Sequence, residues 1–167
     1  MFMIYKKGVQ ADALKRRMKY LEDINEPAKA LEVLSELINM GCRDAEVMFS
    51  GAKNYFQLGD FERSVKWINL TLDFDPGHIG ARLLLARHFI LNNRVPEALN
   101  LYDYIVEKYR DKLTQDDRDE MEDILMYYAK QNKYLVAFYP NVVTFLVEEY
   151  NMKQLLSVVD WHKGSAT

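Results

Sequence analysis

Residues 52–76 read AKNYFQLGDFERSVKWINLTLDFDP, and they show the clearest pattern in the sequence. Apolar residues recur three or four positions apart on both sides of Gly59 and Asp60, a spacing typical of amphipathic helices. Glycine tolerates the left-handed backbone that ends a helix, and aspartate often caps the helix that follows. The stretch therefore predicts two helices joined by a tight turn.

A period of 34 residues extends this pattern in both directions. Small residues recur at Ala30, Ser64 and Ala98, and the same helical face follows each of them. Matching positions one, four, seven and eight residues later are occupied by Leu31, Val65 and Leu99; Leu34, Ile68 and Tyr102; Leu37, Thr71 and Ile105; and Ile38, Leu72 and Val106. Each block therefore repeats one amphipathic helix.

The residues around each turn follow the same period. Asn25, Gly59 and Asn93 lie 34 positions apart, and asparagine shares the ability of glycine to end a helix. Pro27 and Pro96 lie where a second helix should begin. An earlier apolar stripe precedes each turn at Leu14, Met18 and Leu21; Met48, Ala52 and Tyr55; and Arg82, Ala86 and Phe89. We expect three helical pairs, at residues 11–44, 45–78 and 79–112, behind an N-terminal tail of residues 1–10.

The second pair resembles the tetratricopeptide repeat (TPR). The residues that match the positions of that family are Ala52, Tyr55, Gly59, Phe61, Ser64 and Pro76. The resemblance implies an all-α fold, a right-handed solenoid of about three helix-turn-helix repeats. The sequence departs from the family at Leu14, Met48 and Arg82, which occupy the usual tryptophan position, and only the second repeat keeps the closing proline.

Residues 113–167 leave the period and are expected to form a degenerate fourth repeat with capping helices. Thr114 supplies a capping hydroxyl, and the apolar stripe behind it predicts a helix from near Gln115 to near Asn132. Pro140 breaks the helix that would follow, and the apolar residues beyond it predict two short helices over the open end of the stack. The alternative is that these helices form a homodimer surface.

Composition excludes several classes of protein. Of 167 residues, 49% are hydrophobic and 28% charged, which excludes a disordered chain. The net charge of −3 provides no overall basic field, so neither nucleic acid nor a membrane is expected as a partner. The basic cluster at Lys15, Arg16, Arg17 and Lys19 makes an RNA-binding module the weaker alternative. The short apolar start is too brief for a signal peptide or a spanning helix, and we expect a cytoplasmic protein.

Few side chains in the sequence are suited to catalysis or metal binding. His78, His88 and His162 lack a second ligand at helical metal-site spacing, and the single cysteine, Cys42, cannot form a disulfide within the chain. The acidic run at residues 116–123 lies at a predicted helix start, where carboxylates complement the helix dipole. We therefore expect no cofactor, no metal ion and no enzymatic activity.

The expected function follows from the resemblance, which implies a scaffold or adaptor that binds a protein, peptide or helix in a concave groove. The alternative is a dedicated chaperone for an aggregation-prone client. The repeat register places three cations, Lys19, Lys53 and Arg87, one residue after Met18, Ala52 and Ala86. These cations are expected on the concave surface formed by the first helix of each pair. The groove predicted there is lined by Lys15, Lys19, Phe49, Lys53, Phe56, Leu83, Arg87 and Ile90. A basic ladder beside an apolar patch suits a segment that carries carboxylates and hydrophobic anchors.

Overall fold

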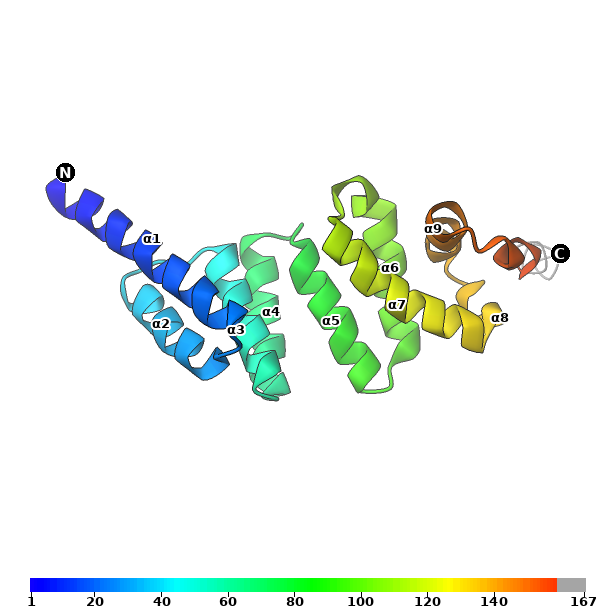
Figure 1. Ribbon diagram of the computed structural model, residues 1–167, viewed down its shortest axis with the longest axis horizontal. Helices are drawn as coiled ribbons and strands as arrows, with labels where there is room; N and C mark the ends of the chain where they lie inside the picture. The colour runs from blue at the N-terminus through cyan, green and yellow to red at the C-terminus, as the bar shows by residue number, and fades with distance from the viewer. Residues whose placement is uncertain (159–167) are drawn as a thin grey trace. The chain divides into compact units, whose positions relative to one another are not determined.

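The computed structural model describes residues 1–158, and every regular element in that range is a helix (Figure 1). The all-α prediction is confirmed for these residues. The chain divides into two compact units, Met1–Leu84 and Leu85–Thr167. The boundary between them falls inside one helix, α5 (Ile79–Leu91).

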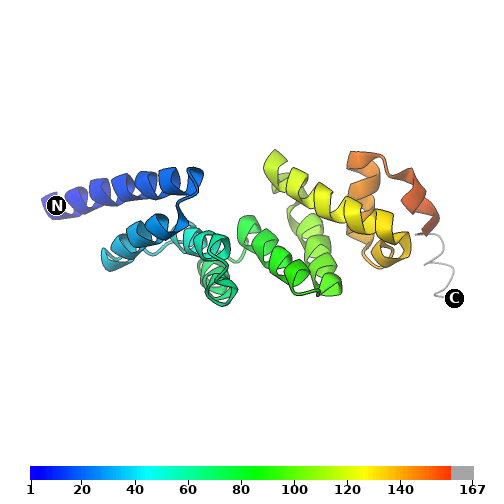
Figure 2. The same cartoon turned by 60° about the horizontal axis from the view of Figure 1, so that its bottom comes forward.

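The first unit contains four complete helices and the start of α5. Their bounds are α1 (Phe2–Asp23), α2 (Pro27–Asn39), α3 (Ala45–Gln57) and α4 (Phe61–Phe74). Neighbours along the chain pack on one another: α1 on α2, α2 on α3, and α3 on α4 (Figure 2). Because α1 already begins at Phe2, residues 2–10 of the predicted N-terminal tail are helical.

The predicted turns share one backbone geometry. Asn25, Gly59 and Asn93 have left-handed φ angles of 57°, 75° and 56°. At each turn, the amide after this residue donates to a carbonyl five residues earlier, at Leu21, Tyr55 and Phe89, over 2.8, 2.9 and 2.8 Å. This is the Schellman arrangement, which satisfies carbonyls at the end of a helix. The prediction that these three residues end helices is confirmed.

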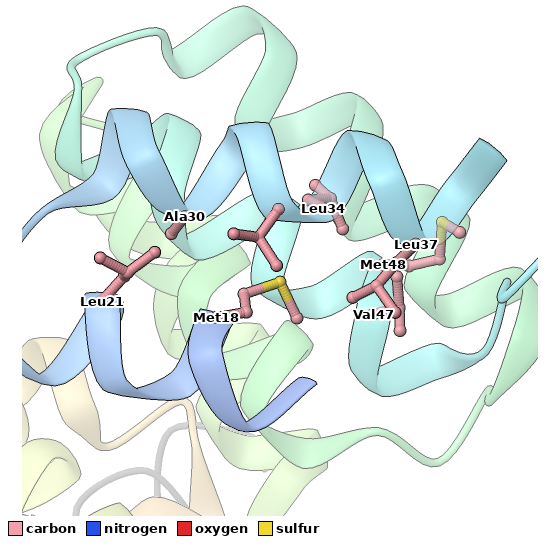
Figure 3. Close-up of a cluster of buried hydrophobic side chains, with 8 residues drawn as sticks. Met18, Leu21, Ala30, Leu34, Leu37, Val47 and Met48 are labelled. Atoms are coloured by element: carbon pink, nitrogen blue, oxygen red, sulfur yellow. The ribbon is translucent and has the colours of Figure 1, made fainter. Parts of the chain in front are cut away.

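The predicted column of small residues is buried, and so are the columns four and seven residues after it, whereas Leu31, Val65, Ile38 and Leu72 in the other two columns are half-buried. Ala30, Ser64 and Ala98 are fully enclosed, as are Leu37, Thr71 and Ile105 seven residues later. The Ser64 hydroxyl donates to the Ala52 carbonyl at 2.8 Å, so α3 and α4 approach closely where both residues are small. In the first unit, side chains from α1, α2 and α3 meet in a single apolar cluster (Figure 3). The cluster contains Met18, Leu21, Ala30, Val33, Leu34, Leu37, Val47 and Met48.

The second unit continues with elements of more varied length, from 3₁₀ turns of three residues to a helix of 17. They are α6 (Val95–Tyr109), the 3₁₀ turn η1 (Arg110–Lys112), α7 (Gln115–Gln131), α8 (Lys133–Val136), α9 (Pro140–Tyr150) and the 3₁₀ turn η2 (Lys153–Leu155). Thr114 and Asp117 form a reciprocal capping box at the start of α7. The predicted helix from Gln115 is confirmed, and so is the new start at Pro140.

Helix α9 packs against α6 through apolar and polar contacts. Val142, Val143, Phe145 and Leu146 are all buried. The Asp103 carboxylate on α6 accepts from the backbone amides of residues 141 and 142, at 2.8 and 3.0 Å, and so caps α9. This face is therefore covered within its own unit, and the choice between a capping role and a homodimer surface for the terminal helices stays a prediction. The end of the predicted capping segment, with Trp161 and His162, lies outside the described residues.

Candidate binding groove

Two adjoining depressions lie between α1 and α3 in the first unit. One, of about 200 Å³, is lined by Lys15, Met18, Lys19, Glu22, Glu46, Val47, Ser50 and Lys53. The other, of about 170 Å³, is lined by Glu22, Asn25, Pro27, Lys53, Asn54 and Gln57. Glu22 and Lys53 belong to both depressions. Three of the predicted groove residues, Lys15, Lys19 and Lys53, therefore lie on one continuous surface.

Glu22 is the centre of a polar network in this groove. Its carboxylate accepts from the Lys53 ammonium at 3.2 Å and from the Asn54 amide at 2.8 Å. The same Asn54 amide group also donates to the Ser50 carbonyl at 2.8 Å. Asn54 is buried, so the network fixes Glu22 and with it one end of the Lys53 side chain.

Lys15 is paired at the other end of the groove. Its ammonium lies 2.8 Å from the Asp44 carboxylate, and this hydrogen bond raises the pKa of Lys15. Burial acts to raise the pKa of Asp44, but hydrogen bonds from Lys15 and from the Val47 amide together lower it. Lys19 is exposed and has no ion pair among residues 1–158. The predicted cations are thus largely neutralised by the protein's own carboxylates, which a ligand carboxylate would have to displace.

Phe49 and Phe56, which the sequence places in the groove, do not line either depression; Phe49 is half-buried next to Lys53. Its ring lies 4.6 Å from that of His78, and the Lys53 ammonium lies 5.1 Å above it. A Cβ added at Gly80 would lie 2.9 Å from this ring, so the absence of a side chain there makes room for Phe49. Phe56, also half-buried, packs on Phe61 with 5.4 Å between ring centres.

Leu83 does not fit the predicted role. Its side chain is only 2% exposed, so it belongs to the core and cannot anchor a ligand without a rearrangement. A column that is exposed in one repeat can thus be covered in another. Arg87 and half-buried Ile90 belong to the second unit, and the continuity of the column of cations into that unit stays a prediction.

A second group of ionisable residues surrounds Arg87 in its own unit. The Arg87 guanidinium lies 3.7 Å from the Glu120 carboxylate on α7. Burial raises the pKa of Glu120, although Arg87 opposes this shift. Burial and then the Glu120 charge raise the pKa of Tyr102, whose hydroxyl has no hydrogen-bond partner within residues 1–158. The signal in the sequence was a tyrosine in a column otherwise occupied by Leu34 and Ile68.

The two histidines that the structure describes serve the fold. His78 Nδ1 accepts from the Ala81 amide at 3.0 Å, so its Nε2–H donates to Glu46 at 2.8 Å. His88 is buried, and burial followed by the nearby Arg87 charge lowers its pKa. Within residues 1–158, no group of three or more His, Cys, Asp or Glu side chains is placed to hold a metal ion. No helix in that range is long and apolar enough to cross a membrane.

No family model matches the chain, and neither a curated protein nor a solved structure is significantly similar to it. What can be inferred about function therefore rests on the residues and contacts described above.

Proposed function

We propose that the chain is a non-catalytic protein-interaction module of the TPR type. Three repeats, at residues 11–44, 45–78 and 79–112, stack as a right-handed solenoid, and residues 113–167 cap it. The recurrence of one Schellman turn at Asn25, Gly59 and Asn93 supports this proposal. So does the burial of equivalent small residues at each repeat.

The ligand is a peptide or helical segment of another protein, bound along α1 and α3. The observation that carries this choice is the groove between these helices, in which Glu22, Lys53 and Asn54 are held together beside the half-buried Phe49 ring. Fixed polar groups next to an apolar wall can orient a segment that offers both charges and hydrophobic anchors. Lys19 adds a cation that no carboxylate of the described chain neutralises.

The test uses peptides selected from a random display library against the intact chain, with affinities measured by calorimetry. Replacing Lys19 and Lys53 together by Glu should weaken the selected peptides by about tenfold or more, because charge reversal at a contact adds repulsion. A matched control reverses Lys29 and Lys66, which are exposed on α2 and α4. Circular dichroism checks that each variant is folded. Equal affinity for the groove variant and the control would place the binding surface elsewhere.

A further inference from the structure

The first turn of α1 exposes apolar side chains all around the helix. The exposed fractions of Met1, Phe2, Met3, Ile4 and Tyr5 lie between 76% and 107%. Successive residues of a helix point about 100° apart, so this end of α1 is apolar in every direction. Figure 1 shows the same turns projecting beyond α2, which is the neighbour of α1 in this unit.

Positively charged side chains follow directly after residues 1–5. Lys6 and Lys7 are exposed, and residues 1–19 contain six Lys or Arg against one Asp. The remaining residues 20–167 contain 16 Lys or Arg against 24 Asp or Glu. Residues 1–19 therefore carry a net charge of +5 (six minus one) and residues 20–167 carry −8 (16 minus 24). The net charge of −3 for the whole chain does not reveal this difference.

We propose that the first turn of α1 inserts into the surface of an anionic lipid bilayer, with Lys6 and Lys7 at the level of the headgroup phosphates. Met1 and the four helical residues after it, at about 1.5 Å each, extend about 7.5 Å. This length matches the depth of about 5–10 Å to which peripheral helices enter the boundary between headgroups and acyl chains. Arg16 and Arg17, exposed further along α1, add longer-range attraction to the negative surface.

A lipid surface accounts for this helix end better than the other anionic or apolar partners. A fluid bilayer surrounds an inserted helix on every side, whereas a flat protein surface, including that of a second copy of this chain, covers one side only. Nucleic acid would match the lysines, but single-stranded binders use aromatic rings that stack on bases, and Met1, Met3 and Ile4 cannot stack. These residues lie outside the α1–α3 groove, so the proposal does not depend on the proposed peptide binding.

The experiment is co-sedimentation of the intact chain with vesicles of phosphatidylcholine and about 30% phosphatidylserine. We expect binding at least about tenfold tighter than to phosphatidylcholine alone, and a steep decrease as salt shortens the Debye length from about 10 Å to about 3 Å. Replacing Phe2 and Ile4 by Ser should weaken binding by about tenfold or more, because both side chains lose apolar burial. Replacing Lys6 and Lys7 by Glu should act in the same direction.

Matched controls change exposed residues of the same kind elsewhere. Phe74 and Leu91 replaced by Ser, and Lys29 and Lys66 replaced by Glu, should bind within about twofold of the parent, as surface substitutions away from the site do. In the variant Phe2→Trp, vesicles should shift the added tryptophan fluorescence to shorter wavelength. Thermal melts establish that all variants are folded.

Three outcomes would overturn the proposal. The first is that the intact chain does not bind anionic vesicles, or that the control variants lose binding as much as the α1 variants. The second is that the chain binds single-stranded RNA through Phe2 and Lys6 without binding vesicles, which would make nucleic acid the partner. The third is self-association that the Phe2 and Ile4 substitutions abolish without any vesicle binding, which would make a second copy the partner.

Discussion

Between Asn25 and Asn93 four helices end at a left-handed residue, at Asn25, Gly41, Gly59 and Asn93, and the backbone itself closes each turn. Beyond Leu113, in the part of the chain that the structure describes, α9 alone ends in this way, at Asn151, and the helix starts rely on side-chain contacts. The later segment uses the Thr114 capping box, the Asp103 cap of α9, and ion pairs to Glu149. A backbone motif can recur because it needs only Gly or Asn and a small residue nearby. Side-chain contacts need particular partners, so the end of the chain loses the period.

The largest effect should come from the apolar core of the later segment. Phe145 on α9 is fully buried, and Phe145→Ala should lower the free energy of unfolding by about 3–5 kcal/mol. Urea denaturation measures it, with Leu156→Ala, half exposed, as a control expected to change stability by less than about 0.5 kcal/mol. A small effect at Phe145 would mean that α9 is not an integral part of the fold.

A second substitution tests close packing in the repeats. A Cβ at Gly51 on α3 would overlap the Trp67 ring on α4, so Gly51→Ala should cost about 1–3 kcal/mol despite the higher helix propensity of alanine. The matched control is Gly8→Ala on α1, where a Cβ meets nothing within 4 Å and should instead stabilise by up to about 1 kcal/mol. Thermal melts of the two variants should move in opposite directions.

The features that local chemistry determines could be predicted from the sequence. Asn25, Gly59 and Asn93 end helices because few other residues tolerate a left-handed backbone, and Ala30 and Ala98 are buried because the helices approach closely there. The turn residues and the small buried residues could both be recognised because each set recurs every 34 residues.

The contacts of long side chains could not be predicted. Lys53 pairs with Glu22 on another helix, and a register of cations does not reveal which carboxylate each one reaches. Tyr55 belongs to a predicted apolar stripe, but it is only half-buried beside Trp67, 6.1 Å away between ring centres. Such differences depend on how neighbouring helices pack, which a repeat pattern leaves open.

The polar contacts of the later segment should make its stability depend on pH. Glu149 accepts hydrogen bonds from Arg110 and Arg118. Burial acts to raise the pKa of Glu149, but these hydrogen bonds outweigh it and lower the pKa below the ordinary 4.5. A lowered pKa in the folded state adds stability that is fully present above about pH 5 and is lost as pH falls through the folded-state pKa.

Glu149→Gln should therefore cost about 1–2 kcal/mol at pH 7, and the difference from the parent should shrink below pH 4.5. Urea denaturation across this range measures it. The control Glu62→Gln removes an exposed pair with Lys66 and should change stability by less than about 0.5 kcal/mol at every pH. A difference that stays constant with pH would mean that packing, and not charge, accounts for the loss.

The smallest effect should appear at the turn of the second repeat. Gly59 has a left-handed backbone, and a Cβ there would meet nothing within 4 Å, so any cost of substitution comes from the backbone conformation alone. Gly59→Ala should therefore cost about 1 kcal/mol. Gly59→Asn should cost only about half as much, because asparagine visits this conformation more readily and already occupies it at Asn25 and Asn93. Thermal melts of the two variants compare them directly, and equal costs would show that the three turns are not interchangeable.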